Sequence, residues 1–171
     1  MSPLRFRIAG PEDALTLSEL GRRTFTETFG HLYRPEDLAA FLENHSAARW
    51  QQELADPRFI VRLGEAEGEA AAFVKLGPPS LPLELRASTV ELRQFYILKP
   101  WHGIGAAQDM MAWALAEARR RGAEEIALSV FTDNHRARAF YARQGFEEVG
   151  TYRFMVGTHA DIDILMRRRL D

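Results

Sequence analysis

Apolar residues recur along the chain with two different periods. In short segments they alternate with polar residues, which is typical of β-strands, and in longer ones they recur at helical spacing. Glycine and proline separate these segments. The pattern predicts strands at 4–8, 58–63, 70–76, 88–98, 125–131, 146–155 and 162–169, and helices at 11–30, from 35, at 46–54, at 105–121 and at 134–144.

The order of these elements predicts an α/β domain with a mixed sheet. Residues 64–69 (GEAEGE) form a polar turn between two strands, so those strands should make an antiparallel hairpin. A helix connects the strand at 88–98 to the strand at 125–131, and such a crossover should make that pair parallel. Helices are expected to cover the sheet.

Composition excludes several classes of function. The chain has 171 residues, 22 basic and 24 acidic, so we expect no bulk electrostatic grip on nucleic acid, although a local basic patch is left open. Cysteine is absent, which excludes disulfides and thiolate chemistry. No two of the five histidines have helical ligand spacing, so no metal site is expected. No apolar run reaches the roughly 18 residues of a membrane span, and no secretory signal is present, so we expect a cytoplasmic protein without a membrane partner.

A glycine-containing turn carries the strongest local signal. Gly103 and Gly105 lie between a predicted strand and a predicted helix, and Ala106 and Ala107 follow them. Free N–H groups at a helix N-terminus attract anions, so a phosphate or pyrophosphate could bind here. A plain strand-to-helix turn is the alternative interpretation. The turn lacks the Gly-Lys-Ser/Thr of a P-loop and the third glycine or alanine of a Rossmann fingerprint.

A second signal lies at 134–146, NHRARAFYARQGF. On a helix, Asn134, Ala137, Arg138 and Tyr141 share one side. A tyrosine with a pKa of about 10 can give a proton to a departing thiolate with a pKa near 8.5. The alternative is that Asn134 only caps the helix and Tyr141 only packs in the core.

Together, these motifs resemble the GNAT superfamily of N-acetyltransferases. Residues 102–107, HGIGAA, are similar to its acetyl-CoA signature, (Gln/Arg)-x-x-Gly-x-(Gly/Ala). Residues 134–146 resemble the motif that follows, and residues 91–98 the strand that precedes it. The likeness covers about residues 70–170. Residues 25–38 are more weakly similar to the PaiA-like polyamine acetyltransferase branch.

The resemblance implies a single N-acetyltransferase domain over residues 1–171. Its sheet would be mixed and largely antiparallel, with about seven strands and helices on both faces. The two central parallel strands would splay apart as a V between 95–98 and 128–131, where acetyl-CoA, the co-substrate, enters. About residues 1–57 would supply an N-terminal strand and acceptor-side helices, and about residues 58–171 the sheet and acetyl-CoA-binding core.

The resemblance also implies which residues hold the coenzyme. Main-chain groups of Phe95 and Ile97 would hold the pantetheine arm, Asn134 would bond it, and Arg143 would meet the 3′-phosphate. Because the family prefers Gln or Arg where this chain has His102, we expect weaker coenzyme affinity rather than none. The amides that would take the pyrophosphate are those of His102, Gly103, Ile104, Gly105, Ala106 and Ala107.

The implied reaction is direct attack of a primary amine on acetyl-CoA in a ternary complex, which makes the protein an acyltransferase. Tyr141 would be the general acid. Glu91 is the candidate base, and strand alternation places it on the same side as Arg93, Phe95 and Ile97. A surface or salt-bridged glutamate is the alternative. A main-chain N–H of the same strand could stabilise the oxyanion.

The N-terminal helices are expected to build the acceptor pocket, although aromatic side chains there would also suit a helix packed on the sheet. The acceptor would be a primary amine of a small molecule, polyamine-like amines included, or of a protein, and a homodimer is left open.

A non-catalytic acyl-CoA sensor and, more distantly, an adenine-nucleotide-binding protein are the alternative functions. The histidines other than His102 have no assigned role and are expected at the surface. The candidate lining residues are Phe25, Glu27, Thr28, Phe29 and Tyr33, with Glu27 available to hold a cation.

Overall fold

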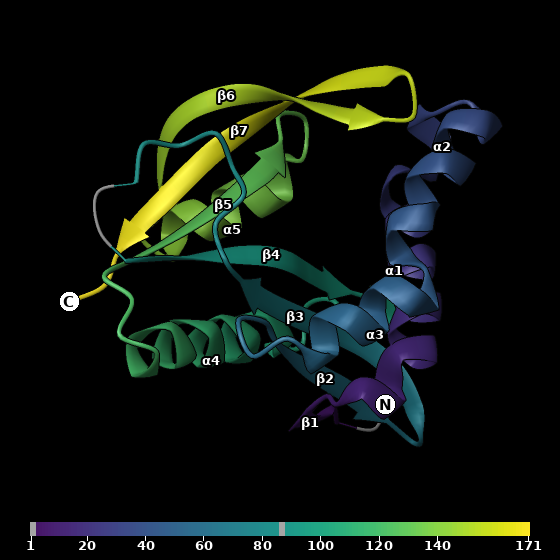
Figure 1. The fold of residues 1–171 in the computed structure, drawn as a ribbon, viewed down its shortest axis with the longest axis horizontal. Helices are drawn as coiled ribbons and strands as arrows, with labels where there is room; N and C mark the ends of the chain where they lie inside the picture. The colour runs from purple at the N-terminus through teal and green to yellow at the C-terminus, as the bar shows by residue number, and fades with distance from the viewer. Residues whose placement is uncertain (1–2, 86–87) are drawn as a thin grey trace.

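A computed structural model describes residues 3–85 and 88–171 (Figure 1). They contain one seven-stranded sheet in the order β1-β2-β3-β4-β5-β7-β6. Its neighbouring strands are antiparallel except for the central pair, β4 and β5, which is parallel as predicted. The strands are β1 (Arg5–Ile8), β2 (Ile60–Ala66), β3 (Glu69–Gly77), β4 (Thr89–Ile97), β5 (Glu125–Phe131), β6 (Glu147–Val156) and β7 (His159–Arg169).

The helices lie close to their predicted bounds, except that α1 begins at Ala14, after a 3₁₀ turn at Pro11–Asp13. Ser46 caps α3, because its side chain accepts a hydrogen bond from the Arg49 N–H at 3.3 Å. Among the described residues, no helix is both long and apolar enough to cross a bilayer. The helices are α1 (Ala14–Phe29), α2 (Pro35–Leu42), α3 (Ala47–Ala55), α4 (Ala106–Arg120) and α5 (His135–Arg143), with short 3₁₀ turns at Pro11–Asp13, Gly30–Leu32, Glu43–His45 and Lys99–Trp101.

Two apolar cores cover the two faces of the sheet. Alternation along β3 sends Val74 to one core and Phe73 to the other. The first core is completed by α4 and α5, through residues such as Met111 and Tyr141. The second core is completed by α1 and α3, through residues such as Leu17. The predicted arrangement of helices on both faces is therefore confirmed.

The two central strands separate after a short paired segment. The paired residues are Thr89 with Glu125, Val90 with Ile126, and Glu91 with Ala127. Beyond them β4 and β5 diverge, and Figure 1 shows the resulting opening. The predicted V-shaped splay is confirmed, and it leaves residues 92–97 and 128–131 facing each other without strand pairing.

β4 contains a bulge that changes which way Glu91 points. In the register with β3, Lys75 lies opposite Gln94 and Leu76 opposite Leu92, so Arg93 is an extra residue. Leu92 therefore shares the α4 face with Phe95 and Ile97, all three belonging to the same core. Glu91, next to Leu92, points to the opposite face. The prediction that Glu91 shares a side with Phe95 and Ile97 is wrong, because simple alternation ignores the bulge.

Several strand boundaries also differ from the prediction. The β2–β3 turn contains only Glu67 and Gly68, both at positive φ (53° and 81°), so the strands extend into the polar segment. β7 begins at His159 rather than at Ile162. The earlier start adds Asp161 to the strand, and this residue belongs to the site described next.

Candidate active site

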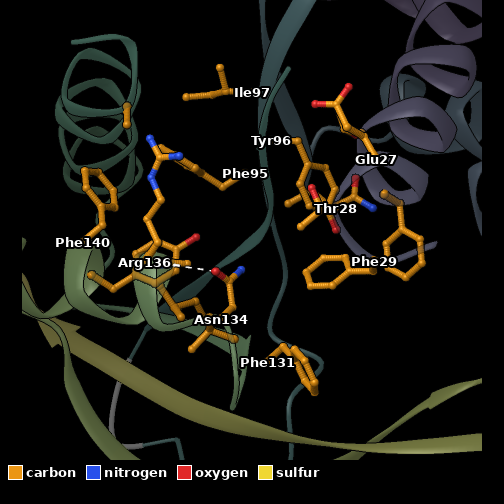
Figure 2. A pocket seen from close by; sticks show the side chains of 18 of the residues that line it. Glu27, Thr28, Phe29, Phe95, Tyr96, Ile97, Phe131, Asn134, Arg136 and Phe140 are labelled. Atoms are coloured by element: carbon orange, nitrogen blue, oxygen red, sulfur yellow. Dashed lines mark hydrogen bonds between the residues drawn. The ribbon is translucent and has the colours of Figure 1, made fainter. Parts of the chain in front are cut away.

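A cavity of about 840 Å³ opens where β4 and β5 separate. Figure 2 shows that side chains of β4 point to opposite sides of it. Phe95 and Ile97 lie on the side of Phe140, which belongs to α5, whereas Tyr96 lies beside Thr28 of α1. We call these two sides the α5 half and the α1 half.

Glycine backbone shapes the α5 half at the start of α4. Gly103 and Gly105 have φ values of 77° and 86°, a left-handed conformation that strains other residues. No atom lies within 4 Å of where a Cβ would stand on either glycine, so the turn is open. Gly105 is also the N-cap of α4 and supplies no side-chain hydrogen bond. The first N–H groups of this helix are thus without a side-chain cap, as an anion site requires.

The structure brings four of the six predicted turn residues to the cavity. Ile104 instead exposes half of its side chain to solvent, and Ala106 is buried in the fold. Neither of these two lines the cavity, whereas Gln108, which was not predicted, does. The four residues that line it are His102, Gly103, Gly105 and Ala107.

The side chain of His102 is held by two neighbours. Arg136 Nη1 of α5 lies 2.9 Å from His102 Nδ1, and His102 Nε2 lies 2.7 Å from the Ile97 carbonyl oxygen. Arginine can only donate, so Nδ1 accepts and Nε2 carries the hydrogen that it donates to Ile97. The pair places a guanidinium beside the turn, in the cavity wall. Sequence reasoning missed Arg136, since only contact in space links it to the turn.

Asn134 begins α5 and also lines the cavity. Its Oδ1 accepts a hydrogen bond from the Ala137 N–H at 3.3 Å, the dashed line in Figure 2, so the capping role is present. The amide nitrogen of the same side chain is left to face the cavity. Arg143 lines the cavity from the other end of α5.

Tyr141 is 8% exposed and lines the cavity from α5. Its ring contacts Phe95 and Phe146, with centroids 6.2 and 5.9 Å apart. Burial, and to a smaller extent Tyr96, raises the pKa of Tyr141 above its usual value. The hydroxyl therefore keeps its proton at neutral pH.

Aromatic side chains form most of the α1 half. The Phe25 ring contacts the Phe41 ring at 4.2 Å, and Phe29 meets Phe131 edge-on at 6.0 Å. All five sequence-predicted acceptor residues line the cavity: Phe25, Glu27, Thr28, Phe29 and Tyr33. The rings that face the α1 half are those of Phe25, Phe29, Tyr33, Phe41, Tyr96, Phe131 and Phe154.

Carboxylates reach the α1 half from α1 and from β7. Glu27 Oε1 accepts a hydrogen bond from the Lys99 N–H at 2.9 Å, which ties α1 to the end of β4. The Tyr33 hydroxyl donates to Asp161 Oδ2, and His159 Nε2 lies 3.0 Å from Asp161 Oδ1. Burial and this contact raise the pKa of Tyr33.

Asp163 is 6% exposed and lines the same half. Burial, and then the charge of Asp161, raises its pKa to about 6, while a hydrogen bond from Ser129 acts in the opposite direction. Sequence reasoning missed both aspartates. The available signal was the alternation of His159, Asp161 and Asp163, which only becomes visible once the strand starts at His159.

Glu91 lies outside the cavity lining. Its Oε1 accepts hydrogen bonds from the Ser80 and Leu81 N–H groups, at 2.7 and 3.2 Å, and its Oε2 lies 3.3 Å from Arg93 Nε. The carboxylate thus holds the loop that follows β3. This placement fits the alternative of a salt-bridged glutamate, and its role as base stays a prediction.

His45 is buried, contrary to the surface position expected for it. Only 1% of it is exposed, and neither ring nitrogen has a hydrogen-bond partner among the described residues. Burial, with Lys75 adding a smaller effect, lowers its pKa to about 4, so the ring is neutral at physiological pH. It lies in the wall of the α1 half beside Phe41.

Comparison with known proteins identifies the class of enzyme to which this site belongs. The model of the acetyltransferase (GNAT) family matches residues 17–146. An uncharacterised N-acetyltransferase of Mycobacterium bovis is 35% identical over 159 residues, which cover 92% of this chain and 98% of the relative. The chain belongs to the GNAT family of acetyltransferases. It is therefore an acyltransferase, and acetyl-CoA is its co-substrate.

Two further comparisons are more distant. An aminoalkylphosphonate N-acetyltransferase of Salmonella typhimurium is 28% identical, over 80% of this chain and 90% of the relative. The crystal structure of a PaiA N-acetyltransferase from Thermoplasma acidophilum, in complex with coenzyme A, superposes with a TM-score of 0.80. That structure is 20% identical and covers 99% of both chains, so it shows the shared fold.

Proposed function

We propose that this enzyme transfers the acetyl group of acetyl-CoA to a primary amine by direct attack in a ternary complex. The observation that carries the proposal is that the cavity at the splay has two halves of different chemistry. One half has open helix N–H groups and a guanidinium, and the other has rings and carboxylates. The acceptor is an amine of a small molecule, with polyamine-like amines included, or of a protein.

The α5 half fits a long anionic co-substrate. The unpaired edge of β4, at Phe95 and Ile97, offers main-chain groups to the pantetheine arm, although the Ile97 carbonyl already faces His102. The turn at 102–107 offers N–H groups to the pyrophosphate. Asn134 and Arg143 complete this half, with a bond to pantetheine and a contact to the 3′-phosphate.

Tyr141 is the proposed general acid. It belongs to α5, and its ring contacts Phe95 of β4, so this tyrosine lies beside the edge proposed for the pantetheine arm. The raised pKa keeps the proton in place until a thiolate develops. Attack by the amine on the thioester carbonyl then expels the thiolate, which takes the tyrosine proton.

Thiol release from acetyl-CoA, measured with a panel of primary amines, tests the proposal. We expect release that depends on the amine, and initial-rate patterns that intersect because both substrates are bound together. Coenzyme binding by calorimetry serves as the control. Binding without thiol release at any amine would contradict the proposal and would favour the acyl-CoA sensor.

A further inference from the structure

We propose that Asp163 is the group that accepts the proton of the incoming amine, and that the acceptor is a cationic amine on an apolar body. This inference rests on the proposed function. It concerns the α1 half, where the nucleophile must bind, and it names a residue of β7 rather than Glu91 of β4.

The placement of Asp163 is the first support. It pairs with Phe131, the last residue of β5, beside the opening between the central strands. At the start of β7 the charged residues are buried and the apolar one is exposed, the reverse of the usual arrangement. Asp161 and Asp163 are 8% and 6% exposed, whereas Ile162 between them is 49% exposed. Burying a carboxylate costs free energy unless the carboxylate is paired, so buried aspartates are rare. Here both aspartates line the cavity.

The neighbours of Asp163 are the second support. The titratable groups that face it are Asp161 on the same strand, Tyr96 on β4, Tyr33 before α2, and Tyr152 on β6. None of them is a cation. A buried carboxylate beside a second one is stable only with a positive partner or a proton. The cation is therefore expected to come from the substrate.

Asp161 and Asp163 differ in how far they are engaged. Asp161 is already bound by the Tyr33 hydroxyl and by His159. Among the described residues Asp163 forms no ion pair, and the Ser129 hydroxyl is the group whose interaction favours its carboxylate form. Asp161 is thus held in place, and Asp163 keeps capacity to accept from a substrate ammonium group.

The remaining wall of the α1 half sets the class of acceptor. Rings such as Phe25, Phe29 and Phe131 favour an apolar body and can also attract an ammonium group. Two aspartates disfavour an anionic substituent. An amine with a negatively charged phosphonate, of the kind named for the Salmonella relative, should therefore be a poor substrate here.

The proton transfers balance as follows. The substrate ammonium gives one proton to the Asp163 carboxylate, and the free amine attacks the thioester carbonyl carbon. The C–N bond forms and the C–S bond breaks, and the departing thiolate takes the proton of Tyr141. The nitrogen sheds its second proton to restore the tyrosine. Asp163 then releases its own proton to solvent, which leaves an amide, coenzyme A and one proton.

The pKa of about 6 suits this role, because the carboxylate is mostly ionised at neutral pH yet able to hold a proton transiently. The wild-type kcat/KM, which reports groups of the free enzyme, should therefore fall on the acidic side with a midpoint near pH 6. In a Glu91→Gln variant this acidic limb should remain.

The test compares Asp163→Asn with Asp163→Glu and with Asp171→Asn, an exposed aspartate outside the cavity lining that serves as matched control. Phenethylamine and 2-aminoethylphosphonate are the acceptor probes. We expect Asp163→Asn to lower kcat by about 100-fold and to remove the acidic limb, while the calorimetric affinity for coenzyme A is unchanged. Asp163→Glu should recover part of the rate, and wild type should prefer phenethylamine by about tenfold or more.

Several results would overturn the inference. They are an Asp163→Asn variant within about threefold of wild type, loss of the acidic limb in Glu91→Gln instead, or a preference for the phosphonate. If Asp163→Asn fails to fold, as judged by thermal melting, Asp163→Glu carries the test through its pH profile. Failure of the proposed function looks different, because wild type itself would then acetylate no amine.

Discussion

At the scale of single residues, the cavity owes its chemistry to a few polar side chains set among rings. Tyr141 is surrounded by Phe95, Phe140 and Phe146, and burial raises its pKa. In the other half of the cavity, burial and then the charge of Asp161 raise the pKa of Asp163. Burial thus favours the protonated form of both side chains. This suits Tyr141 as a proton donor and brings the pKa of Asp163 closer to neutral pH, which suits a proton acceptor.

Replacing Tyr141 by phenylalanine removes the hydroxyl and leaves the ring packing. We expect kcat to fall by about 100-fold or more, because the thiolate then leaves without its proton donor. Coenzyme affinity should stay within about twofold of wild type, since the proposed bonds to coenzyme come from other residues. Thiol release and calorimetry measure the two quantities. Unchanged kcat would remove Tyr141 from the mechanism, and absence of turnover in wild type would favour the sensor.

Arg136 and His102 should act as one unit. Removing either side chain, in Arg136→Ala or His102→Ala, is expected to weaken coenzyme binding by roughly tenfold, because a charged hydrogen bond near the pyrophosphate turn is lost. The double variant should be little worse than either single one. Arg119→Ala, an exposed residue of α4 outside the cavity lining, is the control for calorimetry. Fully additive losses would show that the two residues act separately.

At the scale of elements, the turn before α4 and the β2–β3 hairpin turn share a left-handed glycine conformation but have different roles. Gly105 begins α4 with a φ of 86°, and Gly68 closes the β2–β3 hairpin with a φ of 81°. Neither has an atom within 4 Å of the site of a Cβ. Alanine at either position therefore meets strain and no clash.

The two glycines provide a matched pair of variants. Gly105→Ala and Gly68→Ala should each lower the free energy of unfolding by roughly 1–2 kcal/mol, the strain of a left-handed alanine. Only Gly105→Ala should also weaken coenzyme binding, since Gly105 lines the cavity and Gly68 does not. Denaturant melts and calorimetry separate the two effects. Equal coenzyme affinity in both variants would argue against the turn as the pyrophosphate site.

Sequence reasoning located elements well and side-chain direction less well. Apolar periodicity with glycine and proline stops is local information, so α3 with its Ser46 cap and β5 could be read directly. The side of the sheet to which Glu91 points could not be predicted, because the bulge at Arg93 depends on how β4 pairs with β3. Asp163 and Arg136 were missed since their importance comes from contacts between distant segments.

At the scale of the whole molecule, the sheet consists of two parts joined weakly at the centre. Three residue pairs connect β4 to β5. Across the open end, α1 packs on β3 and β4, while α2 meets β6, with the Phe41 and Phe154 rings 5.5 Å apart. Asp37 of α2 also accepts from the Thr158 N–H at 2.8 Å. The N-terminal helices therefore bridge the opening that holds the substrates.

An ionised carboxylate inside this opening should reduce stability at neutral pH. Because the pKa of Asp163 is about 6 when folded and near 4 when unfolded, the folded state binds the proton more tightly. The contribution of this group to stability therefore falls as pH rises between those values. We expect Asp163→Asn to raise Tm at pH 8, and this gain to shrink toward pH 4. A gain that does not vary with pH would contradict the assigned pKa.

The divergence of β4 and β5 leaves two strand edges without strand partners at the centre of the sheet. Unpaired strand edges are templates on which another chain can add, and soluble proteins usually guard them with charge, bulges or covering segments. Here both edges border the cavity, and residues of α1 and of α5 contribute to its walls. We therefore expect these edges to be covered by the pantetheine arm of the co-substrate rather than by a strand of another protein.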